Sequence, residues 1–92
     1  MKTKKYVIYG IVQGVGFRYY VFRLAQELGI GGWVLNCPDE TVEVVAKGSE
    51  ETLAELEREL RIGPPASRVT KVDVNETIEV VDDVFRIAKG PL

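Results

Sequence analysis

Residues 6–18 read YVIYGIVQGVGFR, and this stretch decides the architecture of the first part of the chain. Residues 6–12 are mostly β-branched or aromatic, and both faces of the segment are apolar, as in a strand that runs inside a sheet. The glycine-rich run 13–16 interrupts that strand. From Phe17 onward the apolar residues follow helical spacing instead. The stretch therefore predicts a strand, a glycine loop and the start of a helix.

The helix that begins at Phe17 presents one apolar stripe to a core, and Gly29 is suited to its C-cap. Residues 33–35 then predict a second strand, which ends at Asn36. The next four residues, 37–40, include a proline and predict a turn. The helical stripe consists of Phe17, Tyr20, Val21, Leu24, Ala25 and Leu28.

The second half of the chain predicts a hairpin strand, a helix and two more strands. Residues 41–47 alternate between apolar and polar side chains, which predicts a half-exposed strand in a hairpin with the strand before it. Ser49 is suited to cap a helix with a leucine stripe, and residues 63–65 stop that helix. Residues 69–78 predict a fourth strand, and residues 84–88 predict a short last strand after an acidic turn.

The predicted order is β-α-β-β-α-β with an additional short strand at the end. This order matches the split βαβ pattern of ferredoxin-like folds, in the α+β class. We therefore expect a ferredoxin-like α/β sandwich, in which two helices pack on one face of an antiparallel sheet. The length of 92 residues predicts a single domain over residues 1–92.

Composition excludes several classes of protein. With 1 Cys the chain forms no intrachain disulfide, which favours a reducing, cytoplasmic compartment. With 0 His it lacks Ser-His-Asp and Cys-His nucleophile systems, and this composition argues against a zinc or haem site. The net charge of −2 argues against nucleic-acid binding. No apolar run approaches the length of a membrane span, and the basic start before residues 6–12 is too short for a signal peptide.

The segment 10–18 is where chemistry is expected. A glycine loop between a strand and a helix points successive backbone N–H groups at one spot, and the helix dipole adds positive potential. Arg18 then offers a planar, always charged donor fork suited to phosphate. On spacing alone, a tight turn beside an exposed arginine explains the segment equally well. Neither standard phosphate fingerprint fits, because Tyr19 stands where G-x-G-x-x-G needs its third glycine and no G-K-[ST] is present.

Asn36 is the second candidate, because its amide both donates and accepts and can hold a water. In the predicted order, the end of strand two can lie near the loop after strand one. Considered alone, Asn36 is better explained as a turn former. Cys37 lacks a histidine partner, and the tyrosines and Trp33 fit core and rim positions. The acidic pairs Asp39-Glu40, Glu50-Glu51 and Asp82-Asp83 fit solvated turns and a helix start.

Two blocks of the sequence resemble the acylphosphatase family. Residues 10–18, GIVQGVGFR, match its signature G-x-V-Q-G-V-x-F-R, and residues 32–36, GWVLN, match its second block G-W-V-x-N. Asp39, Val42 and the stretch 63–69 fit the family pattern as well, so the resemblance covers nearly the whole chain. It implies a ferredoxin-like fold and hydrolysis of a small-molecule acyl phosphate to a carboxylate and inorganic phosphate, without metal or cofactor.

The resemblance also implies roles for individual residues. Arg18 would bind the phosphoryl group, and Asn36 would position the attacking water. The loop would cradle the phosphate through backbone N–H groups of Gln13, Gly14, Val15, Gly16 and Phe17. Two positions depart from the family pattern: Leu35 stands where many members have arginine, and Glu40 replaces a common glycine. Both departures put substrate affinity in question more than activity.

The chemistry of the reaction agrees with this assignment. An acyl phosphate releases a carboxylate, whose conjugate acid has a pKa near ~4, so no general acid is required. Phosphoryl transfer then depends mostly on positioning and charge stabilisation. Two alternatives remain. One is a carbamoyl-phosphate-handling module of the hydrogenase-maturation type, which the short chain makes improbable. The other is a non-catalytic anion- or RNA-binding module on the same fold. We expect a monomer.

Overall fold

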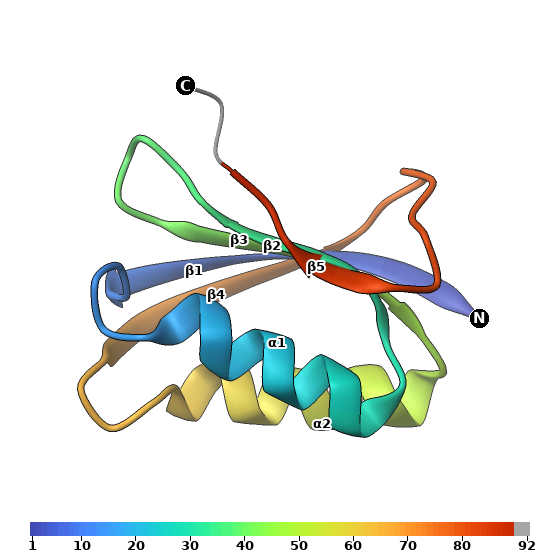
Figure 1. The fold of residues 1–92 in the computed structure, drawn as a ribbon, viewed down its shortest axis with the longest axis horizontal. Coiled ribbons are helices and arrows are strands. Elements are labelled where there is room, and N and C mark those ends of the chain that lie inside the picture. The colour runs from blue at the N-terminus through green and yellow to red at the C-terminus, as the bar shows by residue number, and fades with distance from the viewer. Residues whose placement is uncertain (90–92) are drawn as a thin grey trace.

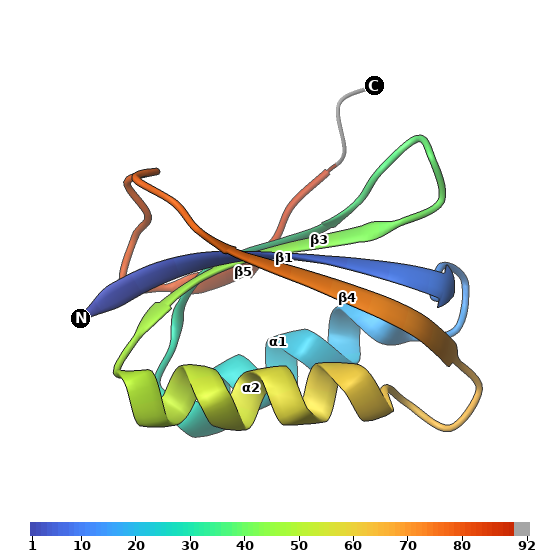
Figure 2. The ribbon, with the colours of Figure 1, turned by 180° about the vertical axis from the view of Figure 1, so that it is seen from behind.

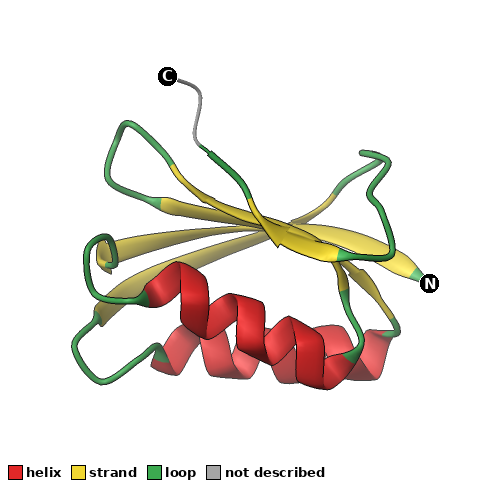
Figure 3. Cartoon of the chain, in the orientation of Figure 1, coloured by secondary structure: helices red, strands yellow, loops and turns green. Residues whose placement is uncertain are grey.

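The computed structural model describes residues 1–89, which form one five-stranded sheet with two helices on one face (Figures 1 and 3). The strands lie in the order β4-β1-β3-β2-β5. This arrangement confirms the predicted ferredoxin-like α/β sandwich. The elements are β1 (Lys2–Ile11), α1 (Phe17–Leu28), β2 (Gly31–Asn36), β3 (Val42–Gly48), α2 (Glu50–Ile62), β4 (Arg68–Glu76) and β5 (Phe85–Ile87).

Strand β1 lies inside the sheet, as its apolar faces predict, and pairs antiparallel with β3 and with β4. It begins at Lys2, four residues before the predicted start, because the backbone of the lysine-rich N-terminus continues the ladder to Gly48. The charged side chains there do not interrupt a ladder that is made by the main chain. Tyr6 and Ile8 are fully buried and contribute to the face that the helices cover.

The predicted antiparallel pairing holds for β1, β2, β3 and β4, whereas β5 pairs parallel to β2. Gly32 lies opposite Phe85 in this pairing, and Val34 lies opposite Ile87. The N–H of Ala88 continues the ladder by donating to the carbonyl of Val34 at 2.8 Å. Strand β5 therefore extends the sheet beyond β2 (Figure 1), and β4 forms the opposite edge, which faces the viewer in Figure 2.

Two strand predictions need correction. Residues 41–47 were expected to be half-exposed, but Val44, Val45 and Ala46 are fully buried because β3 is the central strand. The fourth strand ends at Glu76 rather than at Ile78, whose side chain is 100% exposed. The register of β4 with β1 ends where Glu76 meets Lys4, and one further bond follows it, from the N–H of Thr77 to the carbonyl of Thr3 at 3.1 Å.

Both helices begin and end where the sequence predicts. The N–H of Ile30 donates to the carbonyl of Ala25, and Gly29 closes α1 in the left-handed conformation. The Ser49 side chain accepts from the N–H of Thr52 and caps α2. The apolar stripes of both helices meet the sheet. The core consists of Tyr6, Ile8, Val12, Phe17, Val21, Ala25, Ile30, Val34, Val42, Val44, Ala46, Leu53, Leu56, Leu60, Val72 and Phe85.

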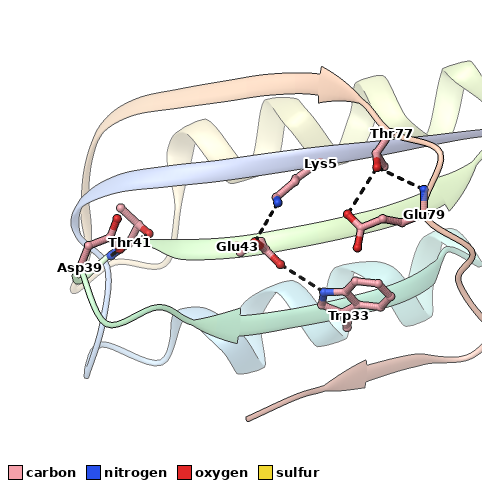
Figure 4. A network of polar contacts seen from close by, with 7 residues as sticks. All are labelled: Lys5, Trp33, Asp39, Thr41, Glu43, Thr77 and Glu79. Atoms are coloured by element: carbon pink, nitrogen blue, oxygen red, sulfur yellow. Dashed lines mark hydrogen bonds and ion pairs between the residues drawn. The ribbon is translucent and has the colours of Figure 1, made fainter. Parts of the chain in front are cut away.

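The face of the sheet opposite the helices carries a polar network centred on Glu43 (Figure 4). Lys5 Nζ lies 3.3 Å from one Glu43 carboxylate oxygen, and the indole N–H of Trp33 donates to the other at 3.4 Å. The network links β1, β3 and β2 across the outer surface. Within residues 1–89, neither helix is long and apolar enough to cross a membrane.

Candidate active site

A cavity of about 230 Å³ lies at the end of the sheet where β1 passes into α1. Strands β1 and β2 both run antiparallel to β3, so their C-terminal ends reach the same edge of the sheet. Figure 1 shows the loop after β1 and the β2–β3 turn together at this end. The cavity is lined by Val12, Gly14, Gly16, Phe17, Arg18, Tyr19, Asn36 and Ile87.

Two glycines give the loop its shape. Gly14 has φ 73° and Gly16 has φ 80°, both in the left-handed region that side chains disfavour. A Cβ on either residue would meet no other atom within 4 Å. The backbone conformation, and not lack of space, therefore requires glycine at both positions, as the sequence predicts.

The backbone N–H groups in the first turn of α1 are not capped by a side chain. Gly16 is its N-cap and supplies no side-chain cap, and its first turn contains no acidic residue. The first intrahelical bond runs from the Tyr20 N–H to the Gly16 carbonyl at 3.0 Å. The amides that precede Tyr20 in the first turn have no intrahelical acceptor. Helix α2 differs, because Ser49 caps it and Glu50 lies in its first turn. The end of α1 thus offers uncompensated positive potential to an anion.

Arg18 and Asn36 lie in the lining of this same cavity, although they are far apart in the chain. Arg18 is exposed and, among the described residues, makes no ion pair. A free guanidinium can bind two oxygens of one phosphoryl group. The structure therefore brings together the arginine and the asparagine that the sequence singles out.

The side-chain oxygen of Asn36 is buried, and within residues 1–89 it has no hydrogen-bond partner. Buried acceptors in native proteins are almost always paired with protein or with ordered water. An unpaired Oδ1 beside a cavity is suited to accept a hydrogen bond from a water or a substrate.

Gln13 and Val15 do not appear in the lining of the cavity, although both belong to the predicted cradle. The Gln13 side chain turns toward the β2–β3 turn, where its Nε2 donates to the carbonyls of Cys37 at 2.8 Å and Thr41 at 2.9 Å. Val15 packs against the core. These two side chains hold the loop in place, and any contact of the two residues with phosphate would come from their backbone.

The β2–β3 turn that follows Asn36 is stabilised by hydrogen bonds between its own residues. The Asp39 carboxylate accepts from the Thr41 hydroxyl at 2.6 Å and from the Thr41 N–H at 3.1 Å, and these bonds hold the pKa of Asp39 below its usual range. Glu40 has φ 72°, a left-handed conformation that a glycine would adopt without strain. Glu40 therefore adopts the backbone conformation that glycine favours.

The cavity is also lined by Val12, Tyr19 and Ile87, for which the sequence predicts no part in the site. Tyr19 falls beside Arg18 in the helix and could have been found from that neighbourhood. Ile87 could not, because its position depends on the parallel pairing of β5 with β2. The acidic pairs and Cys37 lie outside the lining of this cavity. No cluster of three or more potential metal ligands occurs within residues 1–89.

The family profile, a sequence relative and a solved structure that match this chain all carry the same name. Residues 4–87 match the family profile described as Acylphosphatase. An acylphosphatase from Thermotoga maritima is 48% identical over 77 residues, which is 84% of this chain and 86% of that protein. The crystal structure of acylphosphatase from Bacillus subtilis superposes with a TM-score of 0.90 at 36% identity, covering 96% of this chain and 99% of that one.

A larger protein contains a similar unit. HypF from T. kodakarensis superposes with a TM-score of 0.86 at 33% identity, and the match covers 97% of this chain but 12% of HypF. The profile match over residues 4–87 and the relatives at 48% identity show the family. The chain belongs to the acylphosphatase family, whose reaction is the hydrolysis of acyl phosphates.

Proposed function

We propose that the cavity between the 13–18 loop and Asn36 is the active site at which this enzyme hydrolyses acyl phosphates. The family supplies the reaction, in which the carboxyl–phosphate bond is cleaved to give a carboxylate and inorganic phosphate. The roles assigned to individual residues are the proposal. They rest on the lining of one cavity by Arg18, Asn36, Gly14 and Gly16.

The phosphoryl group is held by the loop and by Arg18. Backbone N–H groups of residues 13–17, and those in the uncapped first turn of α1, point donors at its oxygens. The guanidinium of Arg18 binds the remaining oxygens as a planar fork. Negative charge on the equatorial oxygens is stabilised by donors that are already in place before the reaction, which is the dominant contribution in phosphoryl transfer.

The attacking water is held by Asn36, and the unpaired buried Oδ1 is the observation that carries this role. One O–H of the water donates a hydrogen bond to Oδ1, which turns an oxygen lone pair toward phosphorus. The new bond forms between water oxygen and phosphorus, and the bond between phosphorus and the acyl oxygen breaks. The electron pair leaves with the carboxylate, and the water proton passes to the phosphate product or to solvent.

We also propose how the enzyme depends on metals, how it is organised, and whether it binds nucleic acid. The cationic groups of the proposed site are Arg18 and the helix terminus, so we expect hydrolysis to be independent of metal. Residues 1–92 would form one domain and act as a monomer in the cytoplasm; residues 90–92 lie outside the described part. We expect no nucleic-acid partner, because Glu43 places a carboxylate in the middle of the outer sheet face (Figure 4).

Acetyl phosphate hydrolysis in the presence of excess chelator tests the proposal, with the native enzyme compared with Asn36→Ala. Asn75→Ala is the matched control, because Asn75 is exposed on β4 and outside the cavity. We expect turnover to fall about 10²–10³-fold in Asn36→Ala while phosphate still inhibits. Equal turnover in both variants would remove Asn36 from the mechanism.

A folded native protein that binds phosphate without turnover would favour a non-catalytic anion-binding module. A filter-binding titration with single-stranded RNA tests the RNA-binding alternative.

A further inference from the structure

We propose that Tyr19 and Ile87 form the contact surface for the acyl group and favour acyl phosphates whose acyl group is an apolar ring over those with a small acyl group. This inference rests on the proposed function, because it assigns the part of the cavity that the phosphoryl group does not occupy. It names two specificity-determining residues, one on α1 and one on β5.

The lining of the cavity divides by chemistry. The loop glycines, Arg18 and Asn36 supply donors and acceptors suited to phosphate and water. The remaining large side chains at the surface are Tyr19, which is 61% exposed, and Ile87, which is 43% exposed. The acyl group extends from the bound phosphoryl group, and these two exposed side chains are the apolar surfaces of the cavity that it can contact.

Ile87 is partly exposed although it lies on the face of the sheet that the helices cover. Side chains alternate along a strand, so Ile87 lies on the same face as Phe85, which is 2% exposed and belongs to the core. Ile87 pairs with Val34, which is fully buried on the helix side. Ile87 therefore points to the core side of the sheet, yet lies beside the cavity instead of being covered by packing. An apolar side chain in this position gains a partner when an apolar acyl group enters.

Tyr19 is held in a defined position by its neighbour on the helix. Its ring stacks on that of Phe22 with centroids 6.5 Å apart and planes 22° apart. Such a fixed aromatic surface loses little freedom when a ligand packs on it. Tyr19 also borders a second cavity of about 350 Å³, whose polar lining includes Arg23 and Glu27. Gly16 and Tyr19 line both cavities, so the second cavity is the competing path for the acyl group.

Steady-state kinetics with benzoyl phosphate and acetyl phosphate test the assignment. We expect Ile87→Ala and Tyr19→Ala each to lower the ratio of kcat/KM for benzoyl phosphate to that for acetyl phosphate about 5-fold. The change should come from KM for benzoyl phosphate, and the inhibition constant of inorganic phosphate should stay within about twofold. Tyr19→Phe should keep the native ratio, because the ring provides the contact.

The matched control is Ile78→Ala, which makes the same change at a 100% exposed isoleucine outside the cavity and should leave the ratio unchanged. Arg23→Ala tests the competing path. If Arg23→Ala changes the ratio and Ile87→Ala does not, the acyl group enters the second cavity and the inference is overturned. A native ratio in both Ile87→Ala and Tyr19→Ala overturns it as well. Failure of the native enzyme to hydrolyse either substrate would instead refute the proposed function.

Discussion

The side-chain amide of Gln13 is bound to the main chain beside Asn36: Gln13 Nε2 donates to the carbonyl of Cys37 at 2.8 Å. A second bond from the same nitrogen reaches the carbonyl of Thr41 at 2.9 Å. One side chain thereby fixes the distance between the phosphate loop and the turn that follows Asn36. The two halves of the proposed site are joined by this amide, although 24 positions separate Gln13 from Cys37.

We expect Gln13→Glu to lower kcat about 10–100-fold, because it replaces the donor by a carboxylate that faces two carbonyls and displaces Asn36. Each carbonyl keeps one further donor, namely the N–H of Glu40 for Cys37 and the N–H of Cys37 for Thr41, so the free energy of unfolding should fall by about 1 kcal/mol only. Gln26→Glu, on the exposed side of α1, is the control. If Gln13 acts through Asn36, Gln13→Glu should have little effect in an Asn36→Ala background; additive effects would contradict the link.

Arg18→Ala should reduce turnover of acetyl phosphate by about 10²–10³-fold, since it removes a donor prepared for the charge on the phosphoryl oxygens. Arg18→Lys should recover only part of this loss, because an ammonium cannot bind two oxygens in one plane. Arg61→Ala serves as control, as Arg61 pairs with Glu57 on α2 at 3.0 Å, away from the cavity. Native-like turnover in Arg18→Ala would show that the loop amides suffice.

Glu40→Gly should raise the free energy of unfolding by about 0.5–1 kcal/mol. The left-handed conformation costs a non-glycine residue roughly 1–2 kcal/mol, part of which is offset by the greater freedom of glycine in the unfolded chain. Glu40→Ala keeps the Cβ and should show no such gain. Urea denaturation of both variants checks the expectation, and equal stability of the two would point to the charge of Glu40 instead.

Acid should destabilise the β2–β3 turn through Asp39. The pKa of Asp39 is lowered in the folded state chiefly by the Thr41 hydroxyl, so its contribution is fully present above the unfolded value of 3.8 and is lost as the pH falls below it. Unfolding free energies measured from pH 5 downward, about one unit above that value, should therefore decline less steeply in Asp39→Asn. Thr41→Val should flatten the profile partly, and an unchanged slope in both variants would refute the assignment.

Much of this fold can be predicted because the spacing of its apolar residues follows a regular period over long segments. The stripe of α1 repeats over 12 residues, and Gly16 and Gly29 mark both ends of the helix. The proximity of Asn36 to the glycine loop follows from topology alone, since two strands that are antiparallel to a common neighbour run in the same direction. These features depend on local pattern and connectivity, which the sequence contains.

The remainder depends on tertiary contacts that local pattern does not contain. Strand β5 has 3 residues, too few for a period to indicate which strand it joins or in which direction. Its side chain in the cavity, Ile87, is therefore invisible to sequence reasoning. The role of the Gln13 amide cannot be predicted from the sequence either. A glutamine in a loop does not indicate that it will donate to the carbonyls of Cys37 and Thr41.

The short edge strand that carries Ile87 has a consequence for motion. Strand β5 is held to β2 by three residue pairs, whereas β1 is paired along both of its sides. Local opening of the native state starts where few backbone bonds and few apolar contacts must be broken. Amide protons of β5 should exchange with solvent faster than those of β3, and a bound acyl phosphate analogue should slow them. We therefore expect β5, which carries one wall of the cavity, to open more readily than the other strands of the sheet.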